Sequence, residues 1–357
     1  FESRFTFQVR FMSFPKHILC LLLLCAVSAP AAAQRFVAGV DFTTRFDNRE
    51  YSGTPFAEGS ETFFSARLTP CAGLRWAGDN ELIFGVDLLQ DFGDDARFLT
   101  AAKPKIWYRY ASPHVEAAAG IFPRELLSDS YGEAFFDRSW LFYHNRVQGV
   151  MARYRGERSN FVELAIDWEG MQSATQREKF RILSAGEAGG RFLYGGYALT
   201  VLHYAKTSAP GPDEGVVDNI LVNPYAGGRF TAFFDFDIRV GYLQSLQRDR
   251  RLENGWTTPK GGVLDVRMSR WGLTLANMCY VGENLMPFYD LYGGGLYANA
   301  CFYGTREHLY NRTEVSYDRR FFNGTLGVRA ALFFHCDGRS MGMQQLLEVN
   351  VSLGSGR

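Results

Sequence analysis

Apolar and polar residues alternate one by one along many short segments of this chain. In LLEVNVSLG, residues 346–354, Leu and Val alternate with Glu, Asn and Ser. Successive side chains of a strand point to opposite faces, so such a segment is predicted to be a β-strand with one apolar and one polar face. The same period of two recurs in the segments 82–88, 162–168, 264–269, 312–318 and 326–334. A β-sandwich alternates in the same way, so this pattern predicts strands but not their arrangement.

The connections between the predicted strands alternate in length. The long connection DNREYSGTPFAEGS is followed by the short one AGDN, and FGDDARFLTAAK is followed by ASPH. Long loops at one end and short turns at the other are typical of outer-membrane β-barrels. Counting from Arg35 predicts about 16 strands, with about 14 as the alternative, since each needs ~9–11 residues to span a bilayer. The count is ambiguous after residue 262, where the alternation changes phase at 269–270 through either a tight turn or a β-bulge.

The start of the chain carries a different pattern. After Met12, a short basic region precedes the apolar run Ile18–Val27, which is too short to span a bilayer, and three alanines precede Gln34. We therefore expect residues 12–33 to be a signal peptide that is cleaved on export. Residues 1–11 are interpreted as upstream readthrough without a structural role, and residues 34–357 as a single barrel domain. The segment resembles bacterial export signals, and its AAAQ ending is similar to those of many Bacteroidota.

Residues 34–357 as a whole resemble the outer-membrane β-barrel proteins of Gram-negative bacteria, of the porin kind. The resemblance depends on the export signal, the alternation and the loop lengths, and not on a specific motif. It implies an all-β fold, a transmembrane antiparallel barrel with long extracellular loops and short periplasmic turns, in contact with outer-membrane lipid. It also implies passive passage of small hydrophilic solutes or ions through a charged lumen.

Composition and charge agree with this interpretation. The formal net charge is zero, which argues against nucleic acid as a partner. Aromatic residues make up 15% of the chain. Those near predicted strand ends are expected to form interfacial girdles, with sugar-stacking rows inside the pore as the alternative. They are Trp76, Trp107, Tyr108, Tyr110, Trp140, Tyr143, Trp168, Trp256 and Trp271.

The polar faces of the predicted strands carry many charges, which we expect to line the pore. These residues are Glu163, Asp167, Arg177, Lys179, Arg181, Arg239, Asp265, Arg267, Arg312, Glu314, Arg329 and Glu348. The segment QREKFRI places Arg177, Lys179 and Arg181 on one face, opposite the acidic residues of the preceding strand. Two interpretations remain open and compatible: a charged constriction that sets selectivity, or a cross-strand ionic ladder along a wet wall.

Catalytic and metal-binding patterns are absent from the sequence. The chain has no G-x-S-x-G and no H-E-x-x-H, so we predict no enzyme, metal or cofactor. The cysteines after residue 34 form no disulfide framework, although a pair between Cys279 and Cys301 is conceivable; they are Cys71, Cys279, Cys301 and Cys336. An occluded barrel with a surface-binding or envelope-assembly role is the alternative to a channel, and a barrel-embedded hydrolase is the second alternative.

Overall fold

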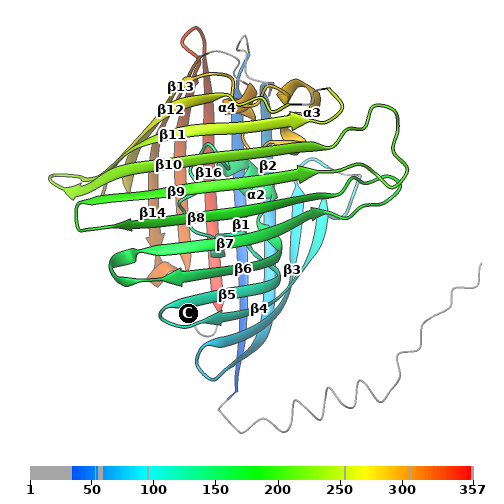
Figure 1. Ribbon diagram of the computed structural model, residues 1–357. Helices are drawn as coiled ribbons and strands as arrows, with labels where there is room; N and C mark the ends of the chain where they lie inside the picture. The colour runs from blue at the N-terminus through cyan, green and yellow to red at the C-terminus, as the bar shows by residue number, and fades with distance from the viewer. Residues whose placement is uncertain are drawn as a thin grey trace, which may run out of the picture.

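Sixteen antiparallel strands form one closed barrel, in which β1 pairs with both β2 and β16 (Figure 1). The computed structural model describes residues 34–354 except 53, 55–58, 95, 253–254 and 305–307. The expected signal peptide, 12–33, and the segment 1–11 lie outside the described residues. The prediction of a transmembrane-type barrel of about sixteen strands is confirmed, and the alternative of fourteen is wrong.

The strands follow one another around the barrel in chain order. Their bounds are β1 Arg35–Glu50, β2 Glu61–Trp76, β3 Asn80–Asp91, β4 Ala101–Ala111, β5 Val115–Pro123, β6 Arg146–Arg155, β7 Phe161–Gly170, β8 Lys179–Gly189, β9 Leu193–Tyr204, β10 Val217–Thr231, β11 Asp235–Asp249, β12 Lys260–Arg270, β13 Leu273–Gly282, β14 Leu309–Phe321, β15 Leu326–Cys336 and β16 Met341–Gly354. The connection after β1 is long, that after β2 is short, and this alternation continues as far as the long connection after β13. The connections after β14, residues 322–325, and after β15, residues 337–340, are equally short. We call the two ends the long-loop end and the short-turn end.

Helices are short and lie in the connections. They are the 3-10 turns η1 Arg124–Leu126, η2 Glu157–Ser159 and η3 Phe322–Gly324, and the α-helices α2 Arg138–Tyr143, α3 Tyr289–Leu296 and α4 Ala300–Gly304. Among the described residues, none of the helices is both long and apolar enough to span a bilayer.

The alternation of side chains places apolar residues on the outer face and polar residues on the inner face. Leu347, Leu164 and Val240 are 47%, 54% and 61% exposed. Glu163, next to Leu164 in β7, is fully buried. An apolar exposed face around a charged interior reverses the distribution of apolar and polar side chains in a soluble sandwich. It is the distribution of a membrane barrel.

The change of phase near residue 270 is a tight turn. Trp271 and Gly272 connect β12 to β13 with φ angles of 53° and 88°. Two successive positive φ angles are those of a type I′ turn, whose twist matches antiparallel strands. The Trp271 ring packs against the ring of Phe233 and under the Arg270 guanidinium, at 5.5 and 4.4 Å between centres. The connection that follows β13 is then a long one that contains α3 and α4.

The aromatic girdle is only partly as predicted. Tyr108, Trp168 and Trp271 are exposed near strand ends, as expected for an interface with headgroups. Trp107, however, lines the interior, and Trp140 belongs to α2 inside the barrel. Tyr143 also lies in α2, where its hydroxyl contacts that of Ser65 on β2. Sequence position near a loop could not distinguish an outward girdle residue from one on a loop that folds inward.

Candidate functional site

Two long connections fold into the lumen instead of extending outward. We call residues 124–145, between β5 and β6, the first inner segment, and residues 283–304, after β13, the second inner segment. Most of their buried aromatic side chains belong to one cluster with inward-facing residues of the strands, including Phe122, Leu183 and Leu243. Because outer strand faces meet lipid, the interior of the barrel is where this apolar surface is removed from water. Figure 1 shows α2 enclosed by the strands.

Arg124 anchors the start of the first inner segment. Its side chain is 6% exposed, and it donates hydrogen bonds to the carbonyl oxygens of His144 and Arg146, at 2.8 and 3.0 Å. It also pairs with the carboxylate of Asp167 on β7. One guanidinium therefore joins the entry and the exit of the segment to the barrel wall, using several of its five donors.

Two arginines of the wall hold α2 at its first residue and at its last turn. The guanidinium of Arg67 donates to the carbonyl oxygen of Phe142, and that of Arg45 donates to the carbonyl oxygen of Arg138 at 3.2 Å. Both guanidinium groups also lie over the Phe142 ring, at 4.4 and 4.9 Å from its centre. The last carbonyls of a helix lack partners within the helix, so the Arg67 cation at Phe142 stabilises the C-terminal end of α2, while Arg45 holds its first residue.

The inner segments are bonded to each other. Asn299 Nδ2 donates to the carbonyl oxygen of Glu133 at 2.7 Å, and the Asp137 amide donates to that of Ala298 at 3.2 Å. The Tyr303 hydroxyl donates to the carbonyl oxygen of Ala134. Complete burial raises the pKa of the Tyr303 phenol well above its ordinary value, so it remains a donor at every physiological pH. The two segments thus form one plug, which we call the interlocked plug.

The second inner segment packs against the long-loop ends of β10, β11, β13 and β14. Tyr292 donates to Asp249 at 2.5 Å and Tyr297 to Gln247 at 3.4 Å, two residues near the long-loop end of β11. Gln247 is fully buried, and its amide nitrogen also contacts the sulfur of Met286 at 3.1 Å. Buried polar groups with several partners fix the segment in one position.

The short-turn half of the lumen holds a cavity of about 1360 Å³. Its walls come from the inner faces of the strands, and its floor is the first inner segment. The cavity extends to the short-turn rim, where Arg320, Gly324 and Ser352 line it. Its lining is rich in charged residues of both signs, which matches a wet interior.

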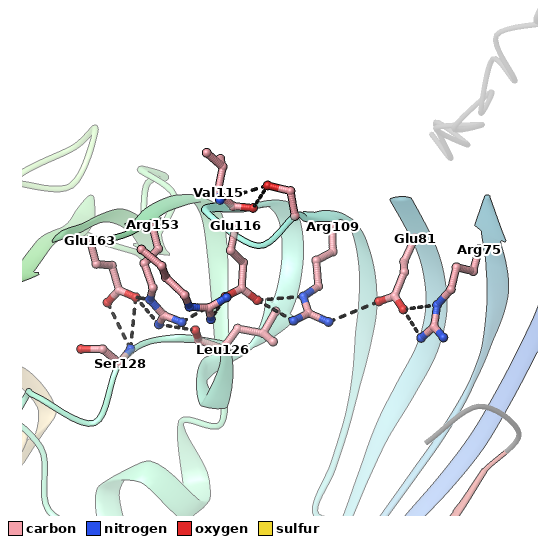
Figure 2. Close-up of polar contacts among 11 residues, drawn as sticks. Arg75, Glu81, Arg109, Val115, Glu116, Leu126, Ser128, Arg153 and Glu163 are labelled. Carbon is pink, nitrogen blue, oxygen red and sulfur yellow. Dashed lines mark hydrogen bonds and ion pairs between the residues drawn. The ribbon is translucent and has the colours of Figure 1, made fainter. Parts of the chain in front are cut away.

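A continuous ionic ladder crosses six strands near the short-turn end (Figure 2). Each member forms an ion pair with the next one along the ladder. The order is Arg75, Glu81, Arg109, Glu116, Arg153 and Glu163. The ladder is tied to the first inner segment, because Glu163 accepts from the Ser128 amide at 3.1 Å and Arg153 donates to the Leu126 carbonyl oxygen at 2.6 Å. The ladder interpretation made from the sequence therefore describes this part of the wall, although only Glu163 of its members was predicted.

Removing the central carboxylate of this ladder is expected to destabilise the barrel strongly. Glu116 is 1% exposed and pairs with Arg109, Arg153 and Arg155. Glu116→Gln would leave three guanidinium groups without their shared partner, and breaking a buried pair costs about 3–5 kcal/mol. Urea unfolding of the purified barrel, followed by its heat-modifiable mobility, measures this. Asp213→Asn is the control, since Asp213 is 95% exposed in its pair with Arg251 and should change stability by less than about 1 kcal/mol. Equal effects of the two variants would contradict the structural role of the ladder.

Seven of the twelve residues that the sequence predicted to line the pore border the cavity. They are Arg239, Asp265, Arg267, Arg312, Glu314, Arg329 and Glu348. Most are paired across strands, for example Arg239 with Asp265 at 3.2 Å and Arg329 with Asp318 at 2.8 Å. Arg312 also reaches Glu133 of the first inner segment at 3.3 Å.

The other five residues do not line the cavity. Glu163 and Asp167 face inward but hold the first inner segment. Lys179 and Arg181 both pair with Glu169, at 2.7 and 2.8 Å, rather than with the carboxylates that the sequence suggested. Arg177 lies before β8, so the three basic residues do not share one strand face, and that part of the prediction is wrong. Its guanidinium donates to the carbonyl oxygens of Ala205 and Gly215 and stacks on Tyr204.

Several lining residues were missed. Arg45, Arg67 and Lys105 occupy inner faces of β1, β2 and β4, and extending the period of two into these strands would have found them. Arg124 and Arg138 lie in the first inner segment, where no periodicity exists to indicate them. Among the described residues, no group of three His, Cys, Asp or Glu side chains could hold a metal ion, and no disulfide joins the cysteines.

Comparisons with known proteins agree with the architecture. The family described as Lipid A 3'-O-deacylase-type matches residues 29–195, somewhat less than half of the chain. A search of curated proteins gave no significant match. Among solved structures, OprB of Pseudomonas putida has a TM-score of 0.50 at 10% identity and covers 98% of this chain and 100% of its own. A variant of OccD1 (OprD) also has a TM-score of 0.50, at 9% identity, and the match covers 91% of this chain and 98% of the OccD1 chain. The outer membrane protein OpdK of Pseudomonas aeruginosa has a TM-score of 0.48, at 9% identity, and the match covers 90% of this chain and 99% of the OpdK chain.

Identities this low establish the fold alone. The closed sixteen-strand ring, the lipid-compatible outer face and the alternation of long and short connections are all shared features of one architecture. By fold, therefore, this chain is a porin-like β-barrel of the outer-membrane type.

Proposed function

We propose that the protein is an outer-membrane channel that lets small hydrophilic solutes or ions pass through a charged lumen. The observation that carries this proposal is the charged cavity of about 1360 Å³ inside a barrel of sixteen strands. A barrel of this size leaves an aqueous channel unless loops fill it. The long loops would then face the outside of the cell, and the cavity would open toward the periplasm.

The interlocked plug defines how such a channel would operate. In this conformation its two segments occupy the lumen and are bonded to strands as far apart as β2, β7 and β11, so we propose that it limits passage and that solutes cross when it is displaced. An occluded barrel with a binding or envelope-assembly role is the second candidate. The hydrogen bonds and ion pairs that hold the plug favour this candidate, and the absence of any conductance would support it.

A barrel-embedded hydrolase is a further candidate because of the family match over residues 29–195. In the described part of the chain, no serine hydroxyl is hydrogen-bonded to a histidine. In structures without substrate, catalytic hydrogen bonds are often long or poorly aligned, so this observation does not exclude a hydrolase. Incubation of the purified barrel with lipid A, followed by mass spectrometry of released acyl chains, distinguishes this candidate from a channel.

Reversing two lumen charges is expected to shift the ion selectivity. Arg267 and Arg320 line the cavity, are exposed, and form no ion pair within the described residues. The double variant Arg267→Glu, Arg320→Glu should therefore move the reversal potential under a salt gradient toward cation selectivity. At 1 M salt the shift should shrink, because the Debye length falls to about 3 Å.

The matched control reverses two arginines at the same end of the barrel but outside the cavity. Arg158 and Arg191 are exposed in the short turns after β6 and β8. Arg158→Glu, Arg191→Glu makes the same change in total charge and should leave the reversal potential nearly unchanged. An equal shift in both double variants would show that total charge, and not the cavity lining, determines selectivity.

A further inference from the structure

Lys105 is a buried cation of the lumen wall that lacks a carboxylate partner. It is 5% exposed, borders the cavity, and forms no ion pair within the described residues. Asp87 on β3 is already shared, because its Oδ1 atom accepts hydrogen bonds from Thr69 Oγ1 at 3.1 Å and Asn145 Nδ2 at 3.4 Å and lies 3.2 Å from Arg67 Nε in an ion pair. Burying an ammonium group without an opposite charge is costly, and an anion bound beside it would offset that cost.

The residues opposite Lys105 across the sheet are small. Lys105 is opposite Gly85 on β3, and Gly85 is opposite Cys71 on β2. Neither neighbour has a side chain long enough to cover the ammonium group. Cys71, Thr69 and Arg67 border the cavity together with Lys105, so this part of the wall is directly accessible from the lumen.

Several basic side chains gather around the same place. Lys103, opposite Asp87, lies within electrostatic range of both Arg146 and Arg67. With Lys105 they make four cations. The carboxylates that act on Lys105 are Asp87, Asp41 and the exposed Glu125 of the first inner segment, and Asp167, which pairs with Arg124, also acts on Arg146. A phosphate group has three strong acceptor oxygens, so it can accept hydrogen bonds from Lys105 and from the Arg67 guanidinium together.

The wall next to Lys105 is also incomplete. Pairing between β4 and β5 begins at Ile106, so residues 101–105 of β4 have no partner on that side. Pro104, which lacks an amide donor, lies in this unpaired stretch, and Arg146 Nη1 approaches its carbonyl oxygen at 3.5 Å. An anion could therefore arrive from the cavity or, as the headgroup of a lipid, from the side of the barrel.

We propose that Lys105 and Arg67 form a binding site for a phosphate-type oxyanion in the lumen wall. The role of this site in passage rests on the proposed function. The site adds to that proposal the charge class of the solute, an anion. Lys105 supplies the uncompensated charge, and Arg67 supplies a guanidinium that Asp87 and the Phe142 carbonyl oxygen hold in place.

Isothermal titration calorimetry of the whole barrel in detergent tests the site with inorganic phosphate at constant ionic strength. We expect saturable binding to the wild type, a loss of affinity of about tenfold or more in Lys105→Met, and near-normal binding in Lys105→Arg. Lys260→Met is the control, since Lys260 is exposed on β12, on the opposite side of the barrel, and should bind as the wild type does. Lys105→Gln replaces Lys105→Met if the latter does not assemble.

A second arm identifies the source of the anion. Thermal stability is measured in micelles containing phosphatidic acid and in micelles containing phosphatidylcholine. Stabilisation by phosphatidic acid alone, lost in Lys105→Met, would assign the site to a lipid headgroup, whereas calorimetric binding of free phosphate assigns it to a solute. Failure of both ligands, or equal responses of Lys105→Met and Lys260→Met, would overturn the proposal. Neither readout needs ion conduction, so a barrel that binds phosphate without conducting would contradict the proposed channel and leave this site standing.

Discussion

One arginine on the outer face of β16 is expected to block assembly of the barrel, whereas an arginine on the inner face of the same strand is expected to be tolerated. Leu347 lies near the middle of β16, points outward and is 47% exposed. Asn350 points inward and lines the cavity. An arginine on a lipid face near the bilayer midplane costs about 2–4 kcal/mol, while one that faces a wet lumen remains hydrated. Leu347→Arg should therefore accumulate unassembled, and Asn350→Arg should form a heat-modifiable barrel in the membrane fraction.

The neighbouring strand offers a second matched pair. Leu332→Arg places the charge on the outer face of β15, and Gly327→Arg places it in the cavity. Gly327 has space for a side chain, since the nearest atom to an added Cβ is the Cβ of Asn350 at 3.7 Å. Equal tolerance of arginine at all four positions would mean that the outer face does not meet lipid.

Removing most of the second inner segment is expected to open the lumen. Replacing residues 286–303 by a short Gly-Ser linker takes away the aromatic side chains that pack against β11, β13 and β14, among them Tyr297 and Phe302. The strands do not depend on this segment for their pairing, because each is hydrogen-bonded to both neighbours. Liposomes that contain this variant should swell several-fold faster in small saccharides than wild-type liposomes.

The control for this variant shortens a loop that does not enter the barrel. Residues 208–213, between β9 and β10, are exposed. Replacing them by the same kind of linker should leave the swelling rate unchanged. If both replacements increase the rate equally, perturbation of the long-loop end in general, and not removal of the plug, is responsible.

The strands could be predicted from the sequence because one physical rule applies along the whole chain. Lipid outside and water inside impose a period of two, and this period also gave the inward direction of residues such as Asp265, Glu314 and Glu348. A two-residue turn at Trp271 was one of two alternatives that the sequence left open, because a change of phase alone does not distinguish a turn from a β-bulge.

The plug could not be predicted, because aromatic residues in a loop fit an interfacial girdle and an inward fold equally well. Trp140 was therefore placed at the membrane interface, although it packs under Arg124 inside the barrel, at 4.9 Å from the guanidinium. Because the plug was not predicted, the partners of Lys179 and Arg181 were also predicted wrongly. Glu163 and Asp167 are occupied by Arg153 and Arg124, so the two cations pair with Glu169 instead.

The most direct test of the central claim is the single-channel conductance of the purified wild-type barrel in a planar bilayer, recorded beside the variant that lacks residues 286–303. A channel limited by the interlocked plug predicts discrete conductance steps in the wild type and steps several times larger in the variant. Conductance that is absent from both proteins would contradict a lumen that carries ions, and equal steps in both would contradict the plug as the limiting element.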